Sequence, residues 1–408
     1  MKIQPLAKTK IDHCLFETDE NGREINIYKL NNTKLVGDSL FYPNTLLYSL
    51  ESKSVTKPTE ERIMSLNKLA KSESLTNVSS GYGSVFDEPV FFFIYNVDNY
   101  YHFLYDSLPY LISYFHLRKK YPKLKLLINK ANAGQEEFYK FVLDMFAILK
   151  IPKESLIIAK SDVLYRKLFI SSSYTHGHDS NLPPRSEVYD FFEKIKLAAS
   201  KDLPEQETPQ KIYISRRTWV HNNLSNIGTN YTTRRRMVCE DELVNRLEKR
   251  DYKEIFTENL SMVEKIRLFS NAKEIIGPIG GGLANALFSA EHTKLLVISS
   301  PTFFDVNSRF KFCFKSKNTS YYDKTRHVES EYFKKFMRVQ TIDSKVGEIT
   351  YISKDSVAIK YSNEGVAGWN SERKFNHATY LKDEVVPLDA GLNSNWTFDV
   401  KNMMELVR

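Results

Sequence analysis

A cluster of three glycines in the second half of the sequence could bind phosphate. An apolar run at 275–279 leads into Gly280, Gly281 and Gly282, and a segment with helical spacing follows. This order is typical of a buried strand, a tight turn and a helix whose first N–H groups are unbonded. Such N–H groups and the helix dipole favour an anion, and glycine lets a ligand approach the backbone. A closely packed strand-to-helix turn fits the spacing equally well.

The cluster matches neither common nucleotide fingerprint. If Gly280 and Gly282 are the first two glycines of a dinucleotide motif, Asn285 stands where a third glycine or an alanine should be. No Gly-Lys-Ser/Thr follows, which excludes a Walker loop. Asn285, one turn into the predicted helix, could itself face a phosphate.

Charged residues follow two other predicted strands of the same half. Arg216 and Arg217 follow a strand at 212–215, and a guanidinium grips phosphate through a bidentate fork. The alternative is a solvated basic strand end. Glu258 follows a strand at 252–256, where it could bind ribose hydroxyls or face a helix dipole.

The first half offers a pair of side chains for acid–base work. His102 and Asp106 are four residues apart, which places them on one face of a helix. An imidazole and a carboxylate in a cleft suit general-base catalysis. Pro109 should kink or restart this helix. Alternatively, Asp106 caps a helix that begins near Leu108 and His102 is structural.

Composition and spacing argue against several other classes. The chain has 58 basic and 50 acidic residues, and its net charge of +8 favours an anionic ligand without selecting one. The dense basic run, Arg234–Arg236, precedes a helix and lacks an aromatic platform, so we expect no nucleic acid partner. The three cysteines fit neither a disulfide framework nor a zinc spacing.

Metal ligands and membrane segments are also not expected. The segment from His176 to Asp179 lacks further metal ligands at a suitable spacing, and the sequence contains no Asp-x-Asp motif. The acidic residues at 240–242 are typical of a helix N-terminus. We therefore expect no metal and no other cofactor. No run approaches the ~20 apolar residues of a membrane span, and no signal peptide is evident, so we expect a cytoplasmic location without a transmembrane segment.

Alternating strands and helices predict an α/β fold of parallel βαβ units in two domains. The first covers residues 1–200, with irregular or β structure to 85 and a Rossmann-like part over 86–200. A polar linker at 201–210 leads to a second Rossmann-like domain over 211–330, in which Ser261 and Glu264 form a capping box. A β-rich extension and a terminal helix follow over 345–408.

Four of these segments, in this order, resemble the signatures of the family 61 glycosyltransferases. The block from Asn99 to Pro109 is similar to its His-x-x-x-Asp motif ending in Leu-Pro, and Tyr213 to Arg216 to its Tyr-Ile-Ser-Arg. Arg236 with Glu240 and Glu242 resembles its Arg, Asn, Glu helix start, with Met237 or Val238 in place of Asn. The stretch from Glu258 to Asn285 resembles its long signature. The likeness covers residues 85–310.

One position departs from the family pattern. The family usually has His after Gly-Pro and then Gly-Ala-Gly, where this chain has Ile279 followed by Gly280, Gly281 and Gly282. The chain therefore lacks an imidazole that could neutralise a diphosphate. This departure motivates an alternative function, a non-catalytic protein that binds nucleotides or glycans on the same fold.

The resemblance implies a GT-B architecture, in which two Rossmann-like domains face each other across a cleft. It implies an inverting, metal-independent transfer of a sugar of the xylose, N-acetylglucosamine or arabinose class. The donor would be a UDP-sugar and the acceptor a glycan or glycoprotein hydroxyl. The expected base is Asp106 or His102, and the expected donor-binding residues are Arg216, Arg217, Glu258, Gly280, Gly281, Gly282 and Asn285. The sequence does not indicate the oligomeric state.

Overall fold

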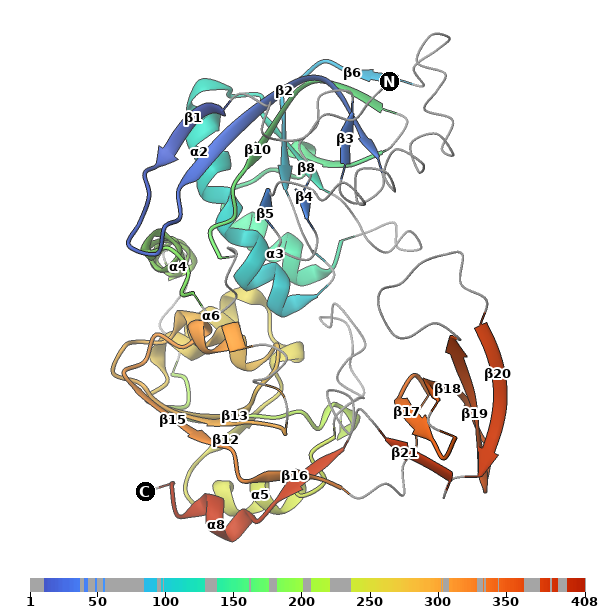
Figure 1. The fold of residues 1–408 in the computed structure, drawn as a ribbon. Helices are drawn as coiled ribbons and strands as arrows, with labels where there is room; N and C mark the ends of the chain where they lie inside the picture. The colour runs from blue at the N-terminus through green and yellow to red at the C-terminus, as the bar shows by residue number, and fades with distance from the viewer. Residues whose placement is uncertain are drawn as a thin grey trace.

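The chain folds into a mixed α/β structure, seen in a computed structural model (Figure 1). The structure describes residues 11–36, 40–42, 48–49, 54–55, 84–93, 97, 99–128, 138–160, 163–175, 182–200, 207–220, 236–301, 303, 308–328, 333, 335–343, 345–362, 375–381, 384–387 and 395–407. Its helices and strands confirm the α/β class. Most of the predicted linker, 201–206, lies outside the described residues.

The first half builds an eight-stranded sheet in the order β1-β2-β10-β7-β8-β9, with β3 beside β2 and β6 beside β10. β1, β2 and β3 pair antiparallel, whereas the pairs among β6 to β10 are parallel. The strands are β1 (Ile11–Phe16), β2 (Ile25–Val36), β3 (Leu40–Tyr42), β6 (Ser84–Phe86), β7 (Val90–Phe93), β8 (Lys125–Ile128), β9 (Leu156–Ile158) and β10 (Val163–Ser171), and a separate pair is β4 (Tyr48–Ser49) with β5 (Ser54–Val55).

β7 consists of one valine and three phenylalanines, all of them buried, as expected for a strand covered on both faces. Helical segments follow three strands of this half, β7, β8 and β10. They are the π-helix η2 (His102–Ser107), the 3₁₀ helices η3 (Leu108–Tyr110) and η4 (Lys153–Ser155), and the α-helices α2 (Leu111–Lys120), α3 (Lys140–Ile148) and α4 (Ser186–Ser200).

The second half builds a five-stranded parallel sheet in the order β12-β11-β13-β14-β15. Its strands are β11 (Lys211–Ile214), β12 (Lys253–Ile255), β13 (Glu274–Pro278), β14 (Lys294–Ile298) and β15 (Asn318–Tyr322). Its helices are α5 (Glu240–Glu248) and α6 (Met262–Asn271), with the 3₁₀ turns η5 (Thr218–Val220), η6 (Thr257–Asn259), η7 (Leu283–Phe288) and η8 (Ser308–Cys313). The strand order reverses between β11 and β13, which is where open α/β sheets bind ligands.

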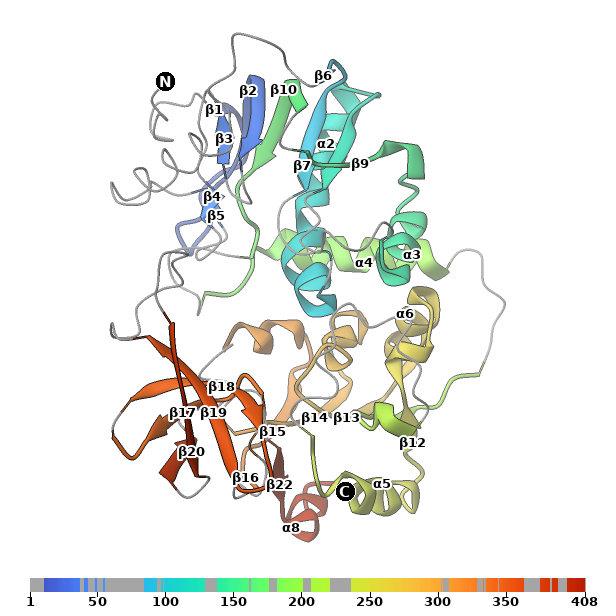
Figure 2. The ribbon, with the colours of Figure 1, turned by 90° about the vertical axis from the view of Figure 1, so that its right-hand side faces the viewer.

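The two halves share one apolar core. α6 begins at a capping box in which Ser261 and Glu264 bond reciprocally to each other's backbone N–H. Figures 1 and 2 show α6 between the two sheets, where it packs against α3 and α4 of the first half. One buried cluster runs from Phe93 and Phe103 to Met262 and Phe288.

The C-terminal part adds a second type of sheet. β17 (Arg338–Thr341), β18 (Val346–Ile352), β19 (Ser356–Ser362), β20 (Phe375–Leu381) and β21 (Val385–Pro387) form an antiparallel sheet with its own core. It is visible in orange and red beside the parallel sheet (Figure 2). A ribbon of β16 (Thr325–His327) and β22 (Trp396–Phe398) flanks it in sequence, so this sheet is an insertion that begins before the predicted residue 345.

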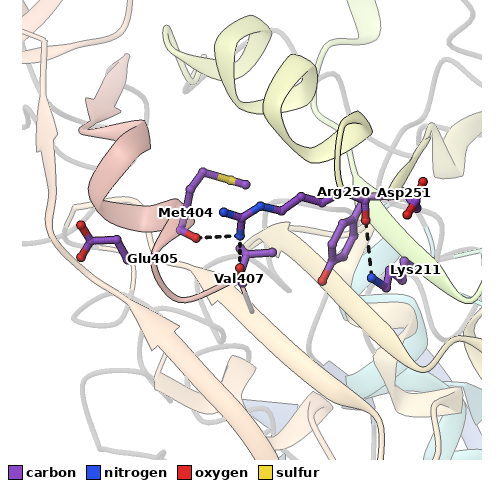
Figure 3. Close-up of a pocket in the computed structure, with 7 residues that line it drawn as sticks. Lys211, Arg250, Asp251, Met404, Glu405 and Val407 are labelled. Atoms are coloured by element: carbon purple, nitrogen blue, oxygen red, sulfur yellow. Dashed lines mark hydrogen bonds between the residues drawn. The ribbon is translucent and has the colours of Figure 1, made fainter.

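The terminal helix α8 (Val400–Met404) packs against the parallel sheet. Arg250, after α5, donates hydrogen bonds to the carbonyl oxygens of Met404, at 3.0 Å, and of Val407 (Figure 3). These residues, together with Lys211, line a pocket of 510 Å³. Because Lys211 begins β11 and Arg250 precedes β12, the pocket lies at the amino-terminal edge of the sheet.

Candidate active site

Arg216 and the glycine turn (Gly280–Gly282) meet at the switch point of the parallel sheet. Arg216 lies just beyond the carboxyl end of β11, and the turn lies just beyond that of the neighbouring β13. The guanidinium packs over the turn so closely that a Cβ atom on Gly280 would lie 2.5 Å from Arg216 Nη1. The structure therefore places Arg216 and the glycine turn in contact. The sequence alone assigned both of them only to the same predicted domain.

The amides of the turn are open to an acceptor. Among the described residues, no main-chain carbonyl accepts a hydrogen bond from the N–H groups of Gly280, Gly281 or Gly282. The helix predicted after the turn is present as η7, a 3₁₀ helix of six residues. Its dipole is correspondingly small, so the amides and the guanidinium supply the positive potential here.

Glu240 holds the main chain at Arg216 in place. It begins α5, is only 1% exposed, and its Oε1 accepts hydrogen bonds from three groups. These are the Tyr213 hydroxyl at 2.8 Å, the Ser215 hydroxyl at 3.2 Å and the Arg216 N–H at 2.7 Å. Burial raises the pKa of the Glu240 carboxyl. Sequence reasoning treated Glu240 as an ordinary helix-start acid, although the family likeness did include it.

The Arg216 guanidinium lies in a desolvated, mostly acidic setting. Burial lowers the pKa of Arg216, while Glu240, Tyr213 and Glu258 oppose that shift. An arginine nonetheless stays protonated in proteins. A charge held in a low-dielectric site and fixed before a ligand arrives stabilises an anion more than a solvated charge does.

Arg217 points to a different part of the sheet. Its Nε and Nη2 donate to Glu254 at 2.9 and 2.6 Å, and its Nη1 donates to Asp241 at 2.8 Å. The hydrogen bonds to Glu254 are the main reason that the pKa of Arg217 is raised. Glu254 belongs to β12, on the side of β11 opposite β13. Arg217 is thus neutralised on that flank and is not brought to the glycine turn.

The side chain of Asn285 stabilises the glycine turn through hydrogen bonds. It is fully buried, its Nδ2 donates to the Gly282 carbonyl at 2.8 Å, and its Oδ1 accepts from the Tyr100 hydroxyl at 2.5 Å. The Tyr100 ring lies against Gly281, where a Cβ atom would be 3.6 Å from the ring. Asn285 therefore shapes the turn and ties it to the first half of the chain.

Glu258 and Lys265 lie near the same place. Glu258 is buried in η6, directly after β12, and its charge acts on both Arg216 and Lys265. Lys265, on α6, is 2% exposed, and its Nζ lies 4.6 Å from the centroid of the Tyr100 ring. Burial lowers the pKa of Lys265 to about 8. Sequence reasoning missed Lys265, since a lysine on an amphipathic helix normally points to solvent.

His102 and Asp106 form a hydrogen-bonded pair on the π-helix η2. His102 Nδ1 lies 2.6 Å from Asp106 Oδ2, and the side chains are 23% and 1% exposed. Asp106 Oδ1 accepts from Arg309 at 3.2 Å and from Thr175 at 3.4 Å. With Nδ1–H bonded to the carboxylate, the neutral imidazole keeps Nε2 as its basic nitrogen.

The geometry separates the two roles that the sequence left open. Asp106 is enclosed and orients the ring, whereas His102 is partly accessible. The alternative of Asp106 as a helix cap is wrong, because Asp106 bonds to other side chains and Ser107 precedes η3 without a side-chain cap. The predicted restart at Pro109 is confirmed by η3 and α2. π-Helical turns are rare and occur often at functional sites.

Two segments considered in the sequence analysis are not among the described residues. They are the segment 176–179 and the arginines at 234 and 235. Within the described ranges, no group of three or more His, Cys, Asp or Glu side chains is arranged to hold a metal ion. No helix in that part of the chain is both long and apolar enough to cross a bilayer.

The parts assembled here are those of a group-transfer enzyme: a cationic, amide-lined switch point and an imidazole–carboxylate pair. Comparison with known families gives the class. The Glycosyltransferase 61 family model matches residues 100–296, which include His102, Arg216 and the glycine turn. Over this stretch the chain matches the family 61 glycosyltransferases, which supports its assignment as an enzyme of the glycosyltransferase class. A search of curated proteins returned no match.

Proposed function

We propose that the protein transfers a sugar from a UDP-sugar to a hydroxyl group of a glycan or glycoprotein, with inversion and without a metal ion. The two sheets would be the Rossmann-like domains of a GT-B enzyme, the first for the acceptor and the second for the donor. In support, a polar site residue follows a parallel strand in each half: His102 lies in η2, after β7, and Arg216 comes just after β11.

The observation that carries the proposal is the contact between the Arg216 guanidinium and Gly280 at the switch point. A leaving diphosphate gains negative charge as the glycosidic bond breaks. Preorganised donors that face the developing charge stabilise the transition state more than the ground state. Arg216 and the three glycine amides would serve as those donors, and Glu258 would bind the ribose.

The first half would supply the base. As the acceptor oxygen bonds to the anomeric carbon, its proton passes to His102 Nε2, and the bond from that carbon to the β-phosphate oxygen breaks. UDP leaves with the electron pair of that bond. Attack from the face opposite the leaving group inverts the anomeric centre. Asp106 holds the imidazole in the required tautomer.

Titration calorimetry with UDP, combined with an assay for turnover of a UDP-sugar panel, tests this function. We expect binding and turnover that persist in EDTA. Arg216→Ala should weaken UDP binding roughly 10- to 100-fold, the effect of losing a charge-assisted hydrogen bond. Arg246→Ala serves as a matched control, since Arg246 pairs with Glu242 on the exposed face of α5. Equal UDP affinity in both variants would count against the assignment, and loss of turnover in EDTA against metal independence.

Ile279 supports a second candidate, a protein that binds nucleotides or glycans without turnover. Ile279 is 3% exposed and packs in the core where the family usually has a histidine. UDP binding without turnover of any sugar in the panel would favour this candidate. A cytoplasmic location is part of the first proposal and can be checked by cell fractionation.

A further inference from the structure

The buried carboxylate of Asp106 has partners from both halves of the chain. Its Oδ2 lies 2.6 Å from His102 Nδ1, and its Oδ1 lies 3.2 Å from Arg309 Nη1. Asp106 is 1% exposed and Arg309 is 8% exposed. Arg309 belongs to η8, beyond the end of the family match at residue 296. Neither the family likeness nor the sequence motifs point to this residue.

The contact fixes the orientation of the carboxylate. Thr175 also donates to Oδ1, at 3.4 Å, so one oxygen is held by Arg309 and Thr175 while the other faces His102. A guanidinium is planar and rigid, and it holds a carboxylate plane better than an ammonium does. The orientation of the imidazole therefore depends on a residue from the second half.

A second contact joins the same two elements. The Tyr101 ring stacks on the Phe310 ring with centroids 4.6 Å apart. Tyr101 precedes His102, and Phe310 follows Arg309. Adjacent residues of η8 thus hold this segment at two points: Arg309 pairs with Asp106 in η2 through charge, and Phe310 packs on Tyr101, just before η2.

We propose that Arg309 is a positioning residue that completes the His102–Asp106 pair from the opposite half of the chain, so that the base is set only when the two halves are packed together. This inference rests on the proposed role of His102. It adds a residue outside the matched region to the acid–base machinery.

Charge balance supports the proposal. Among the described residues, the titratable groups that face the pair include Tyr101, Tyr105 and Cys313. Burial raises the pKa of the Tyr105 hydroxyl and of the Cys313 thiol well above their usual values, which keeps both neutral. Arg309 is a permanent cation at ion-pair distance from Asp106. Without it, the carboxylate charge would act more strongly on the imidazole and favour its protonated form.

NMR titration of the His102 ring tests this independently of turnover. In Arg309→Met, the midpoint of the His102 titration should rise by about 1 pH unit. The acidic limb of the pH profile of kcat/KM should shift to higher pH along with the midpoint. At neutral pH, kcat should fall roughly 10-fold or more. UDP affinity should stay at the wild-type value. Arg246→Met, on the exposed face of α5, is the matched control and should leave the midpoint unchanged.

An unchanged His102 midpoint in a folded Arg309→Met protein would overturn the inference. If Arg309→Met does not fold, Arg309→Gln decides, because the amide keeps a donor near Asp106 while the charge is lost. The midpoint should still rise in Arg309→Gln, and a wild-type midpoint would overturn the inference. A wild-type enzyme that turns over no UDP-sugar would contradict the proposed function instead, whatever the NMR result.

Discussion

Substituting Gly280 with alanine should weaken donor binding while sparing the fold. A Cβ atom at Gly280 would lie 2.5 Å from Arg216 Nη1, and its next described contacts are at 3.7 and 4.0 Å. The clash is therefore with the far end of one flexible side chain. Gly280 does not have a positive φ, so alanine adds no backbone strain. The guanidinium must move by about 1 Å to restore a normal contact distance.

That displacement sets the expected loss of affinity. A hydrogen bond between a charged donor and a phosphate oxygen contributes about 1.5–3 kcal/mol, which corresponds to a roughly 10- to 150-fold change in Kd. The unfolding free energy should change by less than about 1 kcal/mol, because alanine also reduces the entropy of the unfolded chain. UDP titration calorimetry and urea unfolding measure the two quantities.

The neighbouring glycines are internal controls. A Cβ at Gly281 would meet the Tyr100 ring at 3.6 Å, an ordinary contact, so Gly281→Ala should bind UDP with nearly wild-type affinity. A Cβ at Gly282 would lie 2.8 Å from Thr257 Oγ1 and 3.0 Å from Ile214 Cγ2, so Gly282→Ala should lose about 1–3 kcal/mol of stability. Wild-type UDP affinity in Gly280→Ala would refute the reasoning.

Three further outcomes follow from the contacts of the site. Arg217→Ala should leave UDP affinity within about 3-fold of wild type, since its guanidinium is bound to Glu254 and Asp241; calorimetry checks this. Tyr100→Phe should lower the unfolding free energy by about 1–3 kcal/mol in urea, because Asn285 Oδ1 loses its donor while the ring stays against Gly281. The pKa of Lys265 is lowered to about 8 in the fold, so the unfolded chain binds the extra proton between pH 8 and its ordinary value of 10.5. The contribution of Lys265 to stability should therefore increase with pH across that window, and urea unfolding of the wild type and of Lys265→Met at several pH values should show this difference.

Local patterns in the sequence predicted the elements that carry the second-half site. The apolar run before Gly280, the strand before Arg216 and the capping box at Ser261 each depend on near neighbours in the chain. Parallel strands then bring their carboxyl ends to one edge. The contact between Arg216 and Gly280 follows from this arrangement, although its closeness does not.

Contacts between distant segments could not be predicted in this way. Arg309 reaches Asp106 across 203 positions, and Tyr100 reaches Asn285 across 185. No local pattern distinguishes Arg309 from other arginines. Arg217 is a second case, since as an arginine next to Arg216 it was also a candidate for phosphate binding. Its partner Glu254 lies on the flanking strand β12. The order of the strands in a sheet cannot be predicted from the local spacing of residues.

The insertion between β16 and β22 was only partly predictable. Alternating residues indicated antiparallel strands at 349–361, but the return of the chain through β22 to pair with β16 is a long-range event. The sequence therefore suggested an extension at the end of the chain. The structure shows a sheet inserted before the last strand and α8.

A crystal structure of the protein with UDP tests the central claim most directly. We predict the diphosphate between the Arg216 guanidinium and the amides of Gly280, Gly281 and Gly282, with no cation bridging its oxygens. A diphosphate bound elsewhere, for instance against Lys211 and Arg250 in the pocket at the opposite edge of the sheet, would contradict it.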